Sequence, residues 1–221
     1  MDNIEWNKSR WGDASAWEHE FKQGYAWGGR EYVEQWFRHH VLPWIPKTQP
    51  VAALEIACGM GRFTEQLAMH VQRIHAIDLS EVCVAGCRKR FIGNPDIEVS
   101  LTDGKTLPEG KFQLIVSFDS LVHADIDVIA AYLRQAPDRL TPGGTVVIHH
   151  ANHPDLASSR MDVDHQRVQA IIRDIPDLAL NSQTLFRWAK PLKRDATGTS
   201  TGSPEFLDCV TVATRVVPQV G

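Results

Sequence analysis

Residues 51–64 read VAALEIACGMGRFT, and this stretch decides the fold. The apolar run at 51–56 predicts a short buried strand, and Gly59 and Gly61 follow it directly. Because glycine has no Cβ, the backbone can turn sharply there and come close to a ligand. Apolar side chains at helical spacing then occupy residues 62–70. The stretch therefore predicts a strand, a tight turn and a helix.

Strands and helices alternate from this point onward. Further strands are expected at 74–77, 97–101, 112–118 and 145–150, and helices at about 81–91, 125–139 and 162–174. Two last strands, at 184–189 and 205–213, have no helix between them, which predicts an antiparallel hairpin at one edge. We expect an α/β fold with a doubly wound, mostly parallel sheet.

The N-terminal segment has a different composition. Ten of the 18 aromatic residues fall within residues 1–44. Trp17, Phe21 and Tyr25 are spaced as on one face of a helix, which predicts helices over 11–27 and then 32–41. We expect a helical lid at 1–46 and the main domain at 47–221. The alternative is a helix that only packs on the core. In the lid, Trp17, Tyr25 and Trp27 are the candidate substrate-binding residues, since aromatic faces suit sugars or a methylammonium group.

Composition excludes several classes of protein. The chain has 23 basic and 27 acidic residues, a net charge of −4, and therefore no basic excess to attract nucleic acid. Its apolar runs are too short to span a membrane, residues 1–5 do not look like a secretion signal, and four cysteines make no disulfide framework. A cytoplasmic globular protein is expected, with its oligomeric state open.

Ligands of open α/β sheets bind beyond the carboxyl ends of the strands. An acidic residue there, Asp78, stands 19 residues after Gly59, where it can accept the hydroxyls of a ribose. A nicotinamide dinucleotide is disfavoured, because Arg62-Phe63-Thr64 follows Gly61 and the third glycine of that fingerprint is missing.

Residues 54–64 resemble the first motif of the class I methyltransferases that use S-adenosylmethionine, with Ala57 at the place of the family's first glycine. The resemblance continues through Asp78, Asp103, the segment 118–123 and the LTPGG of 140–144, and it covers about 51–215. It implies a seven-stranded, Rossmann-like methyltransferase fold with S-adenosylmethionine as the cofactor.

The same resemblance implies the residues of the cofactor site. Asp78 would bind the ribose, with Leu79 against the adenine. Asp103 would accept from the adenine amino group, and Asp119 would lie near the amino acid end. The full implied set is Glu55, Cys58, Gly59, Gly61, Arg62, Asp78, Leu79, Asp103, Gly104, Phe118 and Asp119.

A narrower resemblance concerns the acceptor. The strings FDSLVH at 118–123, IHHAN at 148–152 and DCVT at 208–211 look like those of methyltransferases from bacterial surface-polysaccharide and sugar pathways. It implies a small-molecule acceptor, with a sugar hydroxyl preferred.

A hydroxyl acceptor must lose its proton, a task that suits a histidine. We expect His150 first, then His123 and His149, as the base, with Asn152 orienting a sugar hydroxyl. Neighbouring strand residues face opposite sides, so at most one of His149 and His150 faces the acceptor. Alternatively, the pair only ends a strand at the surface and His123 caps a helix.

Other functions stay open. A small-amine N-methyltransferase would need no strong base, and a module that binds the cofactor without catalysis would show no turnover. Nucleic-acid methylation is disfavoured by the charge and by Asp119-Ser120-Leu121-Val122, which lacks the Pro-Pro-aromatic motif of base methyltransferases. No metal is expected: histidines 149, 150 and 153 with aspartates 162 or 164 have no diagnostic spacing, and Cys83 and Cys87 suit core thiols better.

Overall fold

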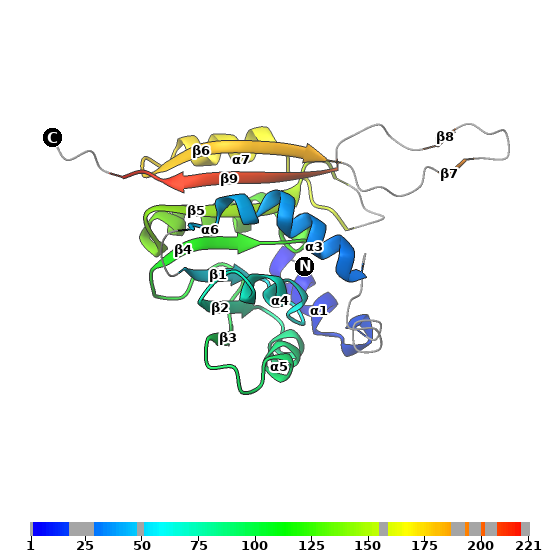
Figure 1. The fold of residues 1–221 in the computed structure, drawn as a ribbon. Coiled ribbons are helices and arrows are strands. Elements are labelled where there is room, and N and C mark those ends of the chain that lie inside the picture. Colours follow the sequence, from blue (N-terminus) through cyan, green and yellow to red (C-terminus); the bar gives the residue numbers. More distant parts are fainter. Residues whose placement is uncertain are drawn as a thin grey trace.

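A seven-stranded sheet forms the centre of the computed structural model (Figure 1). The structure describes residues 2–17, 29–47, 51–154, 159–186, 193–194, 200–201 and 207–217. From edge to edge, the strands are β3 (Ile97–Leu101), β2 (Arg73–Asp78), β1 (Ala52–Ile56), β4 (Phe112–Ser117), β5 (Leu140–Ala151), β9 (Asp208–Arg215) and β6 (Leu178–Phe186).

The strand directions agree with the predicted mostly parallel sheet. β1, β2, β3, β4 and β5 pair in parallel, whereas β9 pairs antiparallel with both β5 and β6. The predicted antiparallel hairpin is thus present, and its second strand, β9, lies inside the sheet. Between β6 and β9 the chain forms a small two-stranded ribbon, β7 (Lys193–Arg194) and β8 (Ser200–Thr201).

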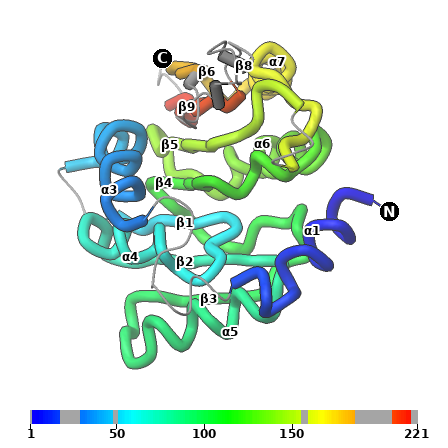
Figure 2. The backbone as a smooth tube through the Cα atoms, turned by 90° about the vertical axis from the view of Figure 1, so that its right-hand side faces the viewer, coloured from blue at the N-terminus to red at the C-terminus, as the bar shows by residue number. Residues whose placement is uncertain are grey.

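Helices cover both faces of the sheet, as a doubly wound fold requires (Figure 2). One face carries α3 (Gly29–His40), α4 (Arg62–Ala68) and α5 (Glu81–Arg90), and the other carries α6 (Ile126–Arg139) and α7 (His165–Arg173). The remaining short elements are α1 (Asn3–Gly12), η1 (Ala14–Trp17), η2 (Leu42–Trp44) and η3 (Leu121–His123).

Successive side chains of a strand point to opposite faces of the sheet, so one hydrophobic core lies on each face. Ala53 faces α3 and α4, while its neighbour Leu54 faces α6. Val33 and Phe37 of α3 are buried in the first core. The division at residue 46 into a lid and a main domain remains a prediction.

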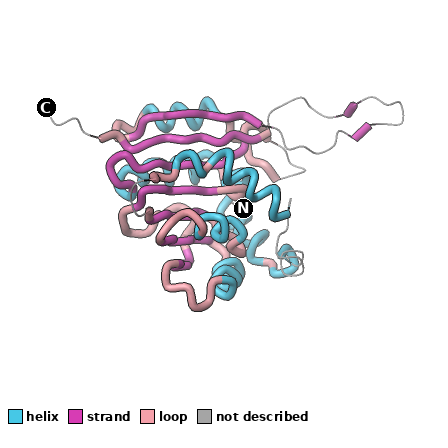
Figure 3. Tube along the Cα trace, in the orientation of Figure 1, coloured by secondary structure: helices cyan, strands magenta, loops and turns pink. Residues whose placement is uncertain are grey.

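Figure 3 shows the strands of the central sheet with helices around them. Two predicted elements differ from the structure in extent. A helix at Asn3–Gly12 was not predicted; it begins there because Asp2 caps it by accepting from the Glu5 N–H. Of the helix predicted over 11–27, residues 11–17 form the end of α1 and the short η1, and residues 18–27 lie outside the described residues. Phe21 and Tyr25 lie outside the described residues. The strand predicted at 184–189 instead begins at Leu178, and a register shift between Leu180 and Ser182 obscures its alternation.

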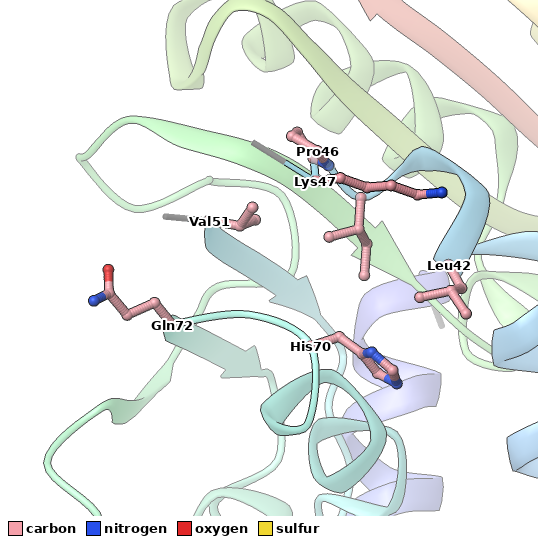
Figure 4. Close-up of a pocket in the computed structure, with 7 residues that line it drawn as sticks. Leu42, Pro46, Lys47, Val51, His70 and Gln72 are labelled. Atoms are coloured by element: carbon pink, nitrogen blue, oxygen red, sulfur yellow. The ribbon is translucent and has the colours of Figure 1, made fainter. Parts of the chain in front are cut away.

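A hollow of about 460 Å³ lies at the amino ends of the strands (Figure 4). Val51, which precedes β1, and Gln72, which precedes β2, line it together with His70 and Lys47. Ligands of such sheets bind at the opposite, carboxyl ends. This hollow is therefore separate from the candidate site.

Candidate functional site

The turn after β1 is built from left-handed backbone. Ala57, Gly59 and Gly61 have φ angles of 58°, 55° and 83°. Ala57 thus adopts the conformation expected of the family's glycine, although its Cβ disfavours it. A Cβ on Gly61 would lie 2.7 Å from Phe91 Cε2 and 2.9 Å from the Cys87 Sγ. Gly61 is therefore needed for packing against α5 and its end.

Gly59 faces the opposite way, toward the N-terminal segment. A Cβ there would lie 3.1 Å from the tip of the Trp17 ring. Trp17 is buried against Met60 and Cys83, and its indole N–H donates to the Trp11 carbonyl oxygen at 3.0 Å. The predicted substrate-binding residue Trp17 thus lies over the glycine turn. Tyr25 and Trp27 lie outside the described residues.

Asp78 joins the second strand end to the glycine turn. Its carboxylate accepts from the backbone N–H of Gly59 and from that of Ser80, both at 2.8 Å. The side chain is buried, and burial raises its pKa above the ordinary value. The carboxylate thus lies beside Gly59, and Leu79 stands between Asp78 and Ser80. The roles of Asp78 at a ribose and of Leu79 at an adenine stay predictions.

Asp103 and Gly104 form the third strand end. The Asp103 carboxylate accepts from the N–H groups of Lys105 and Thr106, at 2.8 and 2.7 Å, so it already shapes its own turn. Gly104, with φ 88°, has Ile4 of α1 packed against it at 3.5 Å from its Cβ position. α1 therefore lies across the carboxyl edge of the sheet near β3 (Figure 2).

The fourth strand end carries an ion pair. Arg62, at the start of α4, donates to the Asp119 carboxylate at 2.5 Å, and its guanidinium lies over the Phe118 ring at 5.6 Å. Asp119 has a left-handed φ of 53°. The Tyr32 ring of α3 lies beside the Phe118 ring, with centroids 6.3 Å apart. Burial raises the pKa of the Tyr32 hydroxyl, and the charge of Asp119 raises it further. Sequence reasoning missed Tyr32, since no strand-end pattern marks a residue of α3.

Two further predicted cofactor residues are buried. Glu55 is 2% exposed, and burial raises its pKa well above the ordinary value. Cys58 is 5% exposed and packs in the core that faces α4, where burial and contact with Cys87 raise its pKa. Direct contacts of these two residues with the cofactor stay a prediction.

The two histidines at the end of β5 face opposite sides of the sheet. His149 lies against Trp36 on the α3 side, with ring centroids 4.8 Å apart. Its Nδ1 accepts from the Asp119 N–H at 3.0 Å, so in the neutral ring Nε2 carries the proton. That Nε2 lies 3.4 Å from Asp208 Oδ2. The lone pair of His149 is thus engaged by the backbone.

His150 is fully buried on the other side. Its Nδ1 donates to the Ala151 carbonyl oxygen at 2.7 Å, so Nε2 is the acceptor, 2.7 Å from the Thr211 hydroxyl. Burial lowers its pKa to about 4. Both ring nitrogens are therefore engaged inside the protein.

His123 differs from this pair. Its Nδ1 donates to the Ser159 carbonyl oxygen at 2.9 Å, so Nε2 keeps the lone pair of the neutral ring. The ring lies beside Trp11 and Trp6, with centroids 5.2 and 6.5 Å away. Burial lowers its pKa. His123 thus has the tautomer that a proton acceptor needs.

Asn152 is held by its surroundings. Its Oδ1 accepts from the backbone N–H of His165 at 3.0 Å, and it lies 2.8 Å from the His165 Nδ1. These contacts anchor the start of α7 to the end of β5. A role toward a sugar hydroxyl stays a prediction.

An ion pair that the sequence did not reveal lies next to these histidines. Arg160 donates to both carboxylate oxygens of Asp208, at 2.6 and 2.7 Å, and both side chains are buried. The only sequence signal was the DCVT string at 208–211. Among the described residues, no three His, Cys, Asp or Glu side chains gather in a way that would hold a metal ion.

The residue types at the strand ends can be compared with the needs of a nucleotide ligand. The Gly59 turn, the Asp78 carboxylate and Gly104 line one edge, and their residue types fit a ribose and an adenine. No described helix is long and apolar enough to cross a membrane.

Comparisons with known proteins bear on the domain type and on the fold. Residues 53–144 match the model of a methyltransferase domain. Nodulation protein S of Rhizobium tropici is 33% identical over 105 residues, which are 46% of this chain and 44% of that protein. The chain spans less than half the length of the curated relatives it matches.

Two solved structures have the same fold. Magnesium protoporphyrin IX methyltransferase from Synechocystis PCC 6803, with bound S-adenosylmethionine, has a TM-score of 0.68 at 13% identity, covering 97% of this chain and 98% of that one. The N-methyltransferase NodS from Bradyrhizobium japonicum WM9, in complex with S-adenosylhomocysteine, has a TM-score of 0.64 at 20% identity, covering 99% and 100%. The chain thus has the Rossmann-like fold of these two methyltransferases, and its residues 53–144 are similar to a methyltransferase domain.

Proposed function

We propose that this protein transfers a methyl group from S-adenosylmethionine to a hydroxyl of a small molecule, preferably a sugar or a saccharide-like compound, with His123 as the base. The observation that carries the proposal is the tautomer of His123, whose Nδ1 donates to the Ser159 carbonyl oxygen and leaves the Nε2 lone pair for a proton. The lone pairs of His149 and His150 are both engaged by protein groups, so His123 replaces His150 as the preferred base.

The cofactor would be held by the residues around the glycine turn. Gly59 lets it approach the backbone, Asp78 binds its ribose, and Asp119 with Arg62 lies at its amino acid end. When bound, S-adenosylmethionine supplies a methyl group on a sulfonium.

The chain itself would contribute position and proton transfer. Most of the acceleration of such an in-line displacement comes from alignment in a site that excludes water. Trp6 and Trp11 beside His123 provide an aromatic wall for the acceptor. Burial lowers the pKa of His123, so the imidazole is neutral near pH 7 and accepts the hydroxyl proton at Nε2.

A second candidate is N-methylation of a small amine. The 33% identity to nodulation protein S and the fold shared with the N-methyltransferase NodS favour it. An amine that arrives neutral needs no strong base, so this activity would survive the loss of His123.

The experiment has two steps. Calorimetric titration with S-adenosylhomocysteine should show saturable binding that Asp78→Ala abolishes; a folded protein with no binding would refute the cofactor site. A screen of sugars and amines then follows, with His123→Gln as the variant and His150→Gln as the matched control. Loss of transfer only in His123→Gln supports O-methylation, whereas transfer that persists in both points to an amine.

A further inference from the structure

The buried ion pair of Arg160 and Asp208 joins residue 160 to the start of β9, which lies between β5 and β6. Asp208 begins β9, opposite Ala151 of β5 on one side and Phe186 of β6 on the other. Its side chain is fully buried, and that of Arg160 is 8% exposed. A carboxylate at this position is fixed by two neighbouring strands, so it is a rigid anchor.

The charge of Asp208 is secured by its partners. Burial alone would raise the pKa of Asp208, but the hydrogen bonds from Arg160 and the contact with His149 lower it to about 2. The two bonds from the Arg160 Nε and Nη2 form a planar fork, which fixes direction as well as distance. Arg160 is therefore held in a single orientation.

Through Arg160, the anchor reaches His123. Ser159, the preceding residue, has a left-handed φ of 57°, and its carbonyl oxygen accepts from His123 Nδ1. The following residue, Met161, donates its N–H to the Val122 carbonyl oxygen at 3.1 Å. Segment 159–161 is thus clamped onto η3, and the carbonyl group that sets the His123 tautomer belongs to this segment.

Through His149, the same anchor reaches Asp119. His149 Nε2 lies 3.4 Å from Asp208 Oδ2, and its Nδ1 accepts from the Asp119 N–H. A carboxylate beside Nε2 favours the proton on that nitrogen, which leaves Nδ1 as the acceptor. Asp119 is thereby held in its left-handed backbone, with its carboxylate on Arg62.

We propose that Arg160 and Asp208 are positioning residues that set the tautomers of both His123 and His149, and so align the proton acceptor with the amino acid end of the cofactor site. This proposal rests on the proposed function only in its consequence for turnover. The tautomers themselves can be measured without any substrate.

The test is nitrogen-15 NMR of the histidine side chains in the full chain. The wild-type protein should show His123 protonated on Nδ1 and His149 on Nε2. In Asp208→Asn, and in Arg160→Lys, which keeps the charge but loses the fork, we expect mixed tautomers for both rings. Asp162→Asn is the matched control: it directly follows segment 159–161, its side chain is 87% exposed, and it should leave both rings unchanged.

The outcomes are distinguishable. Unchanged tautomers in both folded variants would overturn the proposal, and mixed tautomers would support it. If Asp208→Asn does not fold, Arg160→Lys decides alone. With an acceptor in hand, kcat should fall at least tenfold in Asp208→Asn and stay unchanged in Asp162→Asn. If tautomers shift but turnover does not, the positioning stands and the proposed role of His123 fails.

Discussion

Gly59 and Gly61 belong to one motif, yet alanine should damage the protein differently at each. Both have positive φ, where a Cβ costs about 1–2 kcal/mol. At Gly61 the new Cβ would also press on Phe91 and Cys87, and such overpacking costs about 1–3 kcal/mol. Gly61→Ala should therefore lower the free energy of unfolding by about 2–5 kcal/mol.

Gly93→Ala is the control for backbone strain. Its φ of 84° matches the 83° of Gly61, but nothing lies within 4 Å of its Cβ position. We expect a larger loss in the free energy of unfolding for Gly61→Ala than for Gly93→Ala, measured by urea unfolding with equal m-values. The difference between the two losses is the cost of the contact with Phe91 and Cys87. Equal losses in the two variants would refute the packing argument.

Gly59→Ala should instead affect binding. Its Cβ would lie 3.1 Å from the tip of the Trp17 ring, a milder contact than those at Gly61, so the stability loss should stay near about 1–2 kcal/mol. Affinity for S-adenosylhomocysteine, measured by calorimetry, should fall at least tenfold. A folded Gly59→Ala variant with wild-type affinity would contradict the expected position of the cofactor.

Three further predictions concern buried groups. The pKa of His150 is about 4, below the roughly 6.5 of an unfolded chain, so its contribution to stability is present above pH 6.5 and lost as the pH falls toward 4. His150→Gln should flatten the loss of unfolding free energy between pH 7 and 5; an unchanged slope would count against it. Burial raises the pKa of Glu55, so ionising this side chain at higher pH destabilises the folded protein. Glu55→Gln should therefore stabilise the protein more at pH 8 than at pH 5, as urea titrations at both pH values can check. Trp17 lies over Gly59, so S-adenosylhomocysteine should change the tryptophan emission, and Trp17→Phe should remove most of that change.

Local patterns were enough to predict much of the fold. The helix expected at about 81–91 is Glu81–Arg90, and Ser80 caps it by accepting from the Cys83 N–H. The helix expected at 125–139 begins one residue later, at Ile126. These elements depend on short-range periodicity and on capping residues, which the sequence displays directly.

Contacts between distant segments could not be predicted in this way. Arg160 and Asp208 are 48 positions apart, and their pairing depends on β9 lying between β5 and β6. The engagement of His149 likewise depends on the left-handed backbone of Asp119. Sequence identified the histidines as candidates, but only the three-dimensional arrangement distinguishes their tautomers.

The position of β9 has a consequence for how the protein is made. β9 is later in sequence than both of its neighbours, so β5 and β6 cannot complete their pairing until residue 215 has left the ribosome. Until then both strands expose unpaired edges, which are prone to pairing with other chains. Asp208, at the start of β9, is synthesised after Arg160 and His149, so its contacts with both side chains can form only once this strand has been made.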